Sequence, residues 1–286
     1  MDITFKNVSY IYQKNSPFEQ RALEDINVQL PSGSFVSVVG HTGSGKSTFI
    51  QHLNGLLEPT EGVVQVGPYE LSPEKNKHLK GLRKNVGMVF QNPDHQLFEE
   101  TVQKEMMFGP KNFGINVTGT ELENVIKDVG LDLDILSRSP FDLSGGQKKR
   151  VAIASVLVLK PKVLILDEPT AGLDPLGKYK MMELFSHLHK SQQLTIILVT
   201  HHMEDALKYS DQMMVMNKGK VVLIDHPLNV FKRKEYLKEI GLALPEKIEL
   251  IEILQKELNL TIDDAGQSVD ELAKSIGDWV KEGSGS

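Results

Sequence analysis

The pattern of apolar residues divides most of the chain into short buried strands and amphipathic helices. Four short runs are almost wholly apolar, at residues 36–39, 86–90, 163–166 and 195–199. These runs lack the alternation of a strand with one face in water, so they indicate strands buried on both faces of a parallel sheet. The opening segments, 3–12 and 22–30, are expected to form antiparallel strands beside that sheet. The predicted fold class is therefore mixed α/β.

Residues 92–159 have a different character. Apolar residues recur there at helical spacing, as at Leu122, Val125, Ile126 and Val129, and no strongly β-branched run appears. We interpret this segment as a helical subdomain inserted into an α/β domain that spans residues 1–235.

Residues 236–286 are predicted to form a small helical extension. Gly241 and Pro245 mark its boundary, an apolar stripe covers 248–258, and a capping box at 268–271 opens a second helix. Two short amphipathic helices cannot form a core of their own, so we expect them to pack on the main domain or on a partner chain. The closing Gly-Ser residues are expected to form a flexible tail.

Composition narrows the class of protein. No stretch approaches the ~18 to 20 consecutive apolar residues of a membrane-spanning helix, and the chain opens directly as a strand, so neither a bilayer span nor a secretory signal is expected. The absence of cysteine excludes a disulfide scaffold, a thiolate metal site and a cysteine nucleophile, and it favours a reducing cytosol. A net charge of -6 argues against a nucleic-acid partner.

A glycine-rich segment joins the first apolar run to a helical pattern. It consists of Gly40, His41, Thr42, Gly43, Ser44, Gly45, Lys46, Ser47 and Thr48. The spacing matches GxxxxGK[ST], in which backbone N–H groups and the helix N-terminus surround a polyphosphate. We expect Lys46 to reach the β- and γ-phosphates and Ser47 to place its hydroxyl on Mg²⁺. Nucleotide binding is the function that this segment predicts.

Polar residues follow three of the buried runs, at the sheet edge where open α/β folds bind their ligands. Gln91 could coordinate Mg²⁺ and position a water molecule, and Asp167 could hold Mg²⁺ through water. Glu168 is placed to polarise the attacking water, and His201 to reach the γ-phosphate. Two carboxylates have no structural reason to end an apolar strand, whereas a single strand-end glutamine or histidine is often structural.

Three further features are ambiguous when taken alone. Leu143 is followed by Ser144, Gly145, Gly146 and Gln147, which head a helix as either an ordinary cap or a second anion site. Asp174 lies in a turn. Tyr10 and Tyr12 are either ordinary sheet residues or candidates for stacking on a purine base.

Taken together, these features resemble the ATP-binding-cassette (ABC) ATPases over residues 1–235. The order and spacing match Walker A (40–47), the Q-loop (Gln91), the signature (143–147), Walker B (163–168), the D-loop (171–175) and the switch histidine (His201). The resemblance implies a P-loop NTPase fold with a RecA-like core sheet, an antiparallel β edge and an inserted helical subdomain. It also implies ATP and Mg²⁺ as ligands, with Ser144, Gly145, Gly146, Gln147 and Asp174 at the nucleotide. It favours Tyr12, rather than Tyr10, as the residue that stacks on adenine, and it gives His202 no role at the nucleotide.

A narrower resemblance is to the ATPases of energy-coupling factor transporters, in particular the second of the two paralogous subunits. It is carried by residues 90–94, 96–101 and 108–110. It implies a second similar ABC ATPase as partner, a transmembrane coupling protein and a membrane substrate-binding subunit. It places the chain at the cytoplasmic face of the cell membrane as a peripheral protein, with the extension as a dimer contact.

Other interpretations remain open at this point. ABC ATPases of other importers or exporters share the same motifs, as do those of chromosome maintenance and translation, although their long coiled coil or second cassette is absent here. A nucleotide-gated binding module without turnover is a further alternative. For residues 92–108, we expect Leu97 and Phe98 to anchor a helix of a coupling protein and Glu99 and Glu100 to pair with its arginines. The plainer alternative is a solvated acidic face over core residues.

Overall fold

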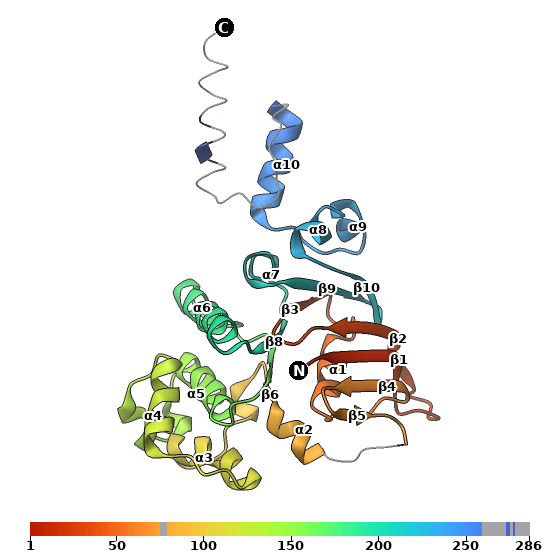
Figure 1. Ribbon diagram of the computed structural model, residues 1–286. Helices are drawn as coiled ribbons and strands as arrows, with labels where there is room; N and C mark the ends of the chain where they lie inside the picture. Colours follow the sequence, from red (N-terminus) through yellow and green to blue (C-terminus); the bar gives the residue numbers. More distant parts are fainter. Residues whose placement is uncertain (75–78, 259–272, 275–276, 278–286) are drawn as a thin grey trace.

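The computed structural model describes residues 1–74, 79–258, 273–274 and 277, which contain two β-sheets (Figure 1). The smaller sheet is antiparallel, with the strand order β2-β1-β4-β5. Its strands are β1 (Ile3–Tyr12), β2 (Gln20–Leu30), β4 (Glu61–Val66) and β5 (Tyr69–Leu71). The two opening segments form antiparallel strands, as the sequence predicts, and they pair with each other.

The larger sheet has the strand order β10-β9-β3-β8-β7-β6. Its strands are β3 (Phe35–Val39), β6 (Val86–Val89), β7 (Val163–Asp167), β8 (Thr195–Val199), β9 (Gln212–Asn217) and β10 (Lys220–Asp225). All neighbours are parallel except the β9–β10 hairpin. The four apolar runs form β3, β6, β7 and β8. Strand β9 also joins this sheet, because it pairs with β3.

Helices pack against the two sheets. They are α1 (Lys46–Leu53), α2 (Leu79–Asn85), α3 (Val102–Phe113), α4 (Gly119–Asp128), α5 (Gly145–Leu157), α6 (Pro175–Gln192), α7 (Met203–Tyr209), α8 (Pro227–Phe231), α9 (Lys234–Glu239) and α10 (Glu246–Leu258), with short 3-10 turns at Pro93–His95, Leu133–Ser137 and Pro140–Asp142. Figure 1 shows α3, α4 and α5 grouped on the opposite side of the large sheet from the antiparallel strands.

Alternate residues of each central strand belong to different cores. In β7, Leu164 and Leu166 pack with α3, α4, α5 and α6, whereas Val163 and Ile165 pack with α1 and the antiparallel sheet. All four side chains are fully buried. A strand buried on both faces needs apolar residues at every position, which is why these runs show no alternation.

The described part of the extension packs on the main domain. Leu237, Leu242, Leu244 and Ile248 share one apolar cluster with residues of α7, β9 and the end of β3. On α10, Leu250 and Ile253 remain exposed. The second predicted helix, at residues 268–279, falls almost entirely outside the described residues, and the expected dimer contact stays a prediction. None of the helices among the described residues has the length and apolar character needed to cross a bilayer.

A buried histidine lies in the helix that follows the glycine-rich loop. The His52 side chain is completely buried, and its Nδ1 lies 2.7 Å from the carbonyl oxygen of Thr48. Nδ1 must donate this bond, because a carbonyl oxygen only accepts. Nε2 has no hydrogen-bond partner among the described residues. Burial lowers the pKa of His52 to about 4, although the bond to Thr48 acts in the opposite direction.

His52 should therefore make the fold sensitive to acid. In the unfolded chain the imidazole takes up a proton as the pH falls through about 6.5, whereas in the folded chain it resists protonation until about pH 4. Between these values the free energy of unfolding should fall by up to about 3 kcal/mol on account of this residue. Urea denaturation at pH 7 and pH 5 should show a smaller loss in His52→Gln than in the native chain. Exposed His226→Gln serves as the control. An equal loss of unfolding free energy in all three proteins would contradict the role assigned to His52.

Candidate nucleotide-binding site

The glycine-rich loop runs from the end of β3 to the first turn of α1. Gly45 is the N-cap of α1 and has φ +103°. A Cβ atom there would lie 2.7 Å from the carbonyl oxygen of Ala22, and one on Gly40 would lie 2.3 Å from that of Met216. Both distances are shorter than real Cβ contacts, so these positions require glycine whatever their chemistry. The loop is thus held between β2 and β9.

Lys46 is a cation held within the site. Its side chain is buried, and Nζ donates hydrogen bonds to the carbonyl oxygens of Gly40 (2.6 Å) and His41 (2.9 Å). Burial lowers the pKa of Lys46, while the negative charges of Glu168 and Asp167 act to raise it. The ammonium group therefore lies on the loop itself, facing two carboxylates.

A cavity of about 380 Å³ lies over the loop, which is the size of small-molecule sites in proteins. It is lined by Tyr12, Gln20, Arg21, Ala22, Thr42, Gly43, Gly45, Lys46, Ser47, Thr48, Gln91, Asp167, Glu168, Val199 and His201. The structure thus brings together residues from five segments that the sequence singled out separately. Gln20 and Arg21, at the start of β2, were missed, because a single polar pair at a strand end carries no motif.

Tyr12 lies at the edge of this cavity, whereas Tyr10 does not line it. The Tyr12 hydroxyl is 3.2 Å from Thr48 Oγ1, and its ring meets Tyr10 edge-on at 4.8 Å. Tyr10 in turn packs edge-on against the buried His52 at 5.1 Å. Tyr10 is therefore a packing residue, and Tyr12 is the aromatic ring available to a ligand.

An acidic pair ends β7, and its second residue, Glu168, is both strained and buried. Glu168 has φ +48°, a conformation that costs a non-glycine residue of order 1 kcal/mol or more, and its N–H donates to the carbonyl oxygen of Val199 (3.0 Å). Its pKa is raised to about 7, first by burial and then by the neighbouring charge of Asp167, against the attraction of Lys46. Burial also raises the pKa of Asp167.

His201 lies directly beside this carboxylate. Its Nε2 is 3.0 Å from Glu168 Oε1, but without the alignment of a hydrogen bond, so the buried Oε1 has no hydrogen-bond partner among the described residues. Burial, Lys46 and His202 all lower the pKa of His201. The imidazole is thus neutral at physiological pH. His202 is the N-cap of α7 and does not line the cavity.

The signature residues lie elsewhere. Ser144 caps α5 by accepting a hydrogen bond from the Gln147 N–H (3.3 Å), and the Gln147 side chain accepts one from the Ser144 N–H (3.0 Å). This confirms the predicted N-cap. None of Ser144, Gly145, Gly146, Gln147 and Asp174 lines the cavity. Lys149, which sequence reasoning missed, donates from α5 to the carbonyl oxygens of Pro169 (3.2 Å) and Ala171.

The donor set at the loop suits a hard divalent cation. Ser47, Gln91 and Asp167 line the same cavity and offer hydroxyl, amide and carboxylate oxygens, which are the ligands that Mg²⁺ prefers. The unpaired Glu168 Oε1 shows that this wall of the cavity has unused acceptor capacity. In the part of the chain that the structure describes, no group of three or more His, Asp or Glu residues could hold a metal by itself. The residues fit Mg²⁺ that is shared with a phosphate.

Comparison with known proteins identifies the family. A family profile described as ABC transporter matches residues 23–171. The energy-coupling factor transporter ATP-binding protein EcfA2 of Bacillus cereus (strain ATCC 10987 / NRS 248) is 50% identical, with 99% of this chain and 98% of the relative covered. The chain belongs to the energy-coupling factor ATPases of the ABC transporter family. The resemblance to the second paralogous subunit is thereby confirmed.

Solved structures agree with the assignment of this energy-coupling factor ATPase. The structure of cbiO1 from Clostridium perfringens, described as part of the ABC transporter complex cbiONQ, has 37% identity and a TM-score of 0.72, and covers 88% of this chain and 98% of its own. The cassette MJ0796, a dimer bound to ADP and Pi, has 28% identity and a TM-score of 0.71, with 79% and 98% covered. The ABC-type fold predicted from the sequence is confirmed.

The negative charge of Glu168 should destabilise the folded state of this energy-coupling factor ATPase. Because its folded pKa of about 7 lies above the unfolded value of 4.5, folding favours the protonated form, and the penalty grows as the pH rises between these values. Glu168→Gln should raise the free energy of unfolding by roughly 2–3 kcal/mol at pH 8, and by much less at pH 5. The measurement is urea denaturation without nucleotide in a chelating buffer. Exposed Glu70→Gln is the control. A loss of stability in Glu168→Gln at pH 8 would contradict the destabilising effect assigned to the Glu168 charge.

Proposed function

We propose that this energy-coupling factor ATPase binds ATP with Mg²⁺ in the 380 Å³ cavity and hydrolyses it to drive a membrane uptake transporter. The observation that carries the proposal is the convergence of Lys46, Asp167, Glu168 and His201 over one glycine-rich loop. A lysine, two carboxylates and a neutral histidine at a phosphate loop are the parts that phosphoryl transfer to water needs. Tyr12 at the rim is available to stack on adenine.

The loop and its lysine hold the phosphates. Lys46 Nζ bonds two loop carbonyl oxygens, and incoming phosphate oxygens would compete for the same N–H donors. Ser47, Gln91 and Asp167 would hold Mg²⁺, which when bound neutralises charge on the phosphate oxygens. Catalysis of this kind depends on positioning and charge stabilisation more than on covalent chemistry.

Glu168 and His201 act on the attacking water and the γ-phosphate. A carboxylate with a pKa near 7 is a stronger base than an ordinary glutamate, which suits it to orient the water and accept its proton. The neutral His201 lies 3.0 Å from this carboxylate and faces the same cavity. Its imidazole can therefore contact both the glutamate and the transferred phosphoryl group.

The signature residues are proposed to complete the site of a second ATPase. Ser144, Gly145 and Gln147 head α5 away from their own cavity, and Asp174 lies beyond it as well. The N-terminus of a helix is an anion site, but because Ser144 does not line its own cavity, this one can serve only a nucleotide on another chain. The dimer reported for the MJ0796 cassette supports this arrangement. The proposed partner is a similar, paralogous ABC ATPase.

The proposed contact with a transmembrane coupling protein lies on the segment after Gln91. Phe98 and Phe108 are 55% and 41% exposed and meet edge-to-face at 4.7 Å. The buried Glu105 carboxylate accepts hydrogen bonds from the N–H groups of Phe98 and Glu99, each 2.9 Å long, and so holds this aromatic pair in place. The expectation that Leu97 is an anchor was wrong, because Leu97 is buried in the apolar core that α3, α4, α5 and α6 share with one face of the large sheet.

Such an arrangement makes the chain a peripheral subunit at the cytoplasmic face of the cell membrane. The coupling protein would bind the aromatic pair, and a membrane substrate-binding subunit would complete the transporter. Nucleic acid has no place in this proposal. The description of cbiO1 as part of a transporter complex supports it for a related chain.

Substitution of Glu168 separates binding from hydrolysis. In the assembled transporter, Glu168→Gln should keep nucleotide affinity and reduce phosphate release by roughly 10²–10⁴-fold, because general-base assistance is lost. Lys46→Ala should instead weaken nucleotide binding itself. A pair of histidine variants gives the matched comparison: His201→Gln should impair hydrolysis, while His202→Gln, outside the cavity, should leave it near normal. Near-normal turnover in Glu168→Gln would remove this residue from the mechanism.

Loss of the aromatic pair should disconnect the subunit from the membrane. Phe98→Ser combined with Phe108→Ser removes the exposed apolar contact, and buried apolar anchors carry most of the affinity at such interfaces. The double variant should bind nucleotide normally but fail to co-purify with the membrane subunits. Glu99→Lys tests the charge contribution, since Glu100 is already paired with Lys104. Phe18→Ser, at an aromatic side chain that is 79% exposed, is the control. Intact co-purification of the double variant would place the coupling surface elsewhere.

A further inference from the structure

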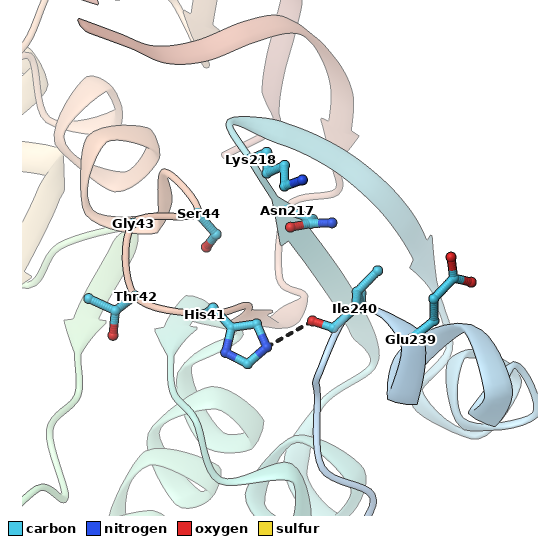
Figure 2. Close-up of a pocket in the computed structure, with 8 residues that line it drawn as sticks. All are labelled: His41, Thr42, Gly43, Ser44, Asn217, Lys218, Glu239 and Ile240. Atoms are coloured by element: carbon cyan, nitrogen blue, oxygen red, sulfur yellow. Dashed lines mark hydrogen bonds between the residues drawn. The ribbon is translucent and has the colours of Figure 1, made fainter.

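The phosphate loop separates two cavities. The first is the nucleotide cavity described above, which His41 and Ser44 do not line. The second has a volume of about 510 Å³ and is lined by His41, Thr42, Gly43, Ser44, Asn217, Lys218, Glu239 and Ile240 (Figure 2). Thr42 and Gly43 line both cavities. The loop backbone at Thr42 and Gly43 therefore faces the nucleotide cavity on one side and, on the other, a cavity that the C-terminal extension also lines.

His41 bridges this second cavity. Its ring is directed at the extension, and Nε2 lies 2.8 Å from the carbonyl oxygen of Ile240 (Figure 2). The carbonyl oxygen only accepts, so Nε2 carries the proton. Gly241 leaves room for the ring, because a Cβ atom on it would lie 2.8 Å from Nε2. Gly241 also has φ +74°, a conformation that suits glycine.

The geometry of α9 explains why this carbonyl group is available. The N–H of Gly241 bonds the carbonyl oxygen of Lys238 (2.9 Å), and that of Leu242 bonds the carbonyl oxygen of Leu237 (2.8 Å). This pair of bonds is the Schellman motif of a helix C-terminus, and it satisfies the carbonyls one turn back. The carbonyl of Ile240 lies past the last helical bond, so it needs a donor from outside the helix. His41 supplies that donor.

The extension also contacts the elements on either side of the nucleotide. Its residues Leu242 and Leu244 share one apolar cluster with Val39, which directly precedes the loop, and with Met203 of α7. The N–H of Glu246 donates to the Glu204 carboxylate of α7 (3.2 Å). Helix α7 follows the His201 segment. Residues 237–248 are therefore packed against both the strand that carries the loop and the helix next to the histidine.

We infer that His41 is a positioning residue that ties the outer face of the phosphate loop to the C-terminal extension. A loop that this contact holds in place binds nucleotide more tightly, and nucleotide stabilises the docking of residues 237–248 by the same factor, because coupling between two sites is reciprocal. The extension thus sets the affinity of this subunit for nucleotide. This inference rests on the proposed nucleotide site.

The test uses the full chain with ADP and Mg²⁺, and it measures nucleotide affinity together with hydrogen exchange of residues 237–248. In the native chain, nucleotide should slow exchange in this segment. His41→Phe keeps a ring but removes the donor, and it should abolish that protection and weaken binding about two- to tenfold, the value of one hydrogen bond. His41→Gln, whose amide can also donate, should restore part of both effects.

A second variant approaches the link from the extension. Gly241→Ala forces a Cβ atom against His41 and should weaken nucleotide binding by a similar factor, although Gly241 does not line the nucleotide cavity. Gly114→Ala is the matched control, because Gly114 ends α3 with φ +67° and has open space around it. The double variant His41→Phe with Gly241→Ala should be no weaker than either single variant, as expected for one shared contact.

The outcomes are distinguishable. Native protection of residues 237–248 by nucleotide in His41→Phe, or unchanged affinity in Gly241→Ala, would overturn the inference while leaving the nucleotide site intact. Additive losses in the double variant would overturn it as well. Failure of the native chain to bind ADP and Mg²⁺ at all would instead refute the proposed function.

Discussion

The close packing of the phosphate loop is the constraint on which the rest of the site depends. Gly40 and Gly45 bring the loop so near to the backbones of Met216 and Ala22 that a single methyl group would not fit at either position. The N–H of Gly219 also bonds the carbonyl oxygen of Ser44 (3.0 Å). The β9–β10 hairpin and β2 therefore fix the loop before any ligand arrives, and Lys46 and Ser47 inherit their positions from that contact.

Charge and strain gather where the chemistry is proposed. Glu168 combines a left-handed backbone, a buried carboxylate and a neighbouring carboxylate, and each of these costs folding free energy. The compensating attraction comes from Lys46, whose own ammonium group is buried. The charges of Glu168 and Lys46 thus stabilise each other. A phosphate that enters the cavity would change the surroundings of both groups. A site arranged in this way is prepared for a ligand at the expense of stability.

The sequence predicts these features to different extents, for physical reasons. The strands β3, β6, β7 and β8 are readable because burial on both faces demands uninterrupted apolar residues, and the loop is readable because its glycines are sterically required. The pairing of β9 with β3 is not, since a methionine-rich strand carries no mark of its neighbour. Leu97 was misplaced for a related reason: an apolar residue beside acids suits either a surface anchor or a core position, and only packing decides between them. The bond from His41 to Ile240 joins residues 199 positions apart, so no local sequence pattern predicts it.

Helix α5 connects the parts of the molecule that have to respond together. Lys148, in its first turn, pairs with Asp94 of the segment after Gln91 at 2.8 Å, and the next residue, Lys149, bonds the backbone that follows Glu168. Both lysines are partly buried, although the Asp94 carboxylate is largely exposed. A displacement of the segment after Gln91, or of the segment after Glu168, therefore acts on the same helix, and Ser144 is the N-cap of that helix. The signature end of α5 is therefore linked to the segments that follow Gln91 and Glu168, because the adjacent side chains of Lys148 and Lys149 bind one segment each.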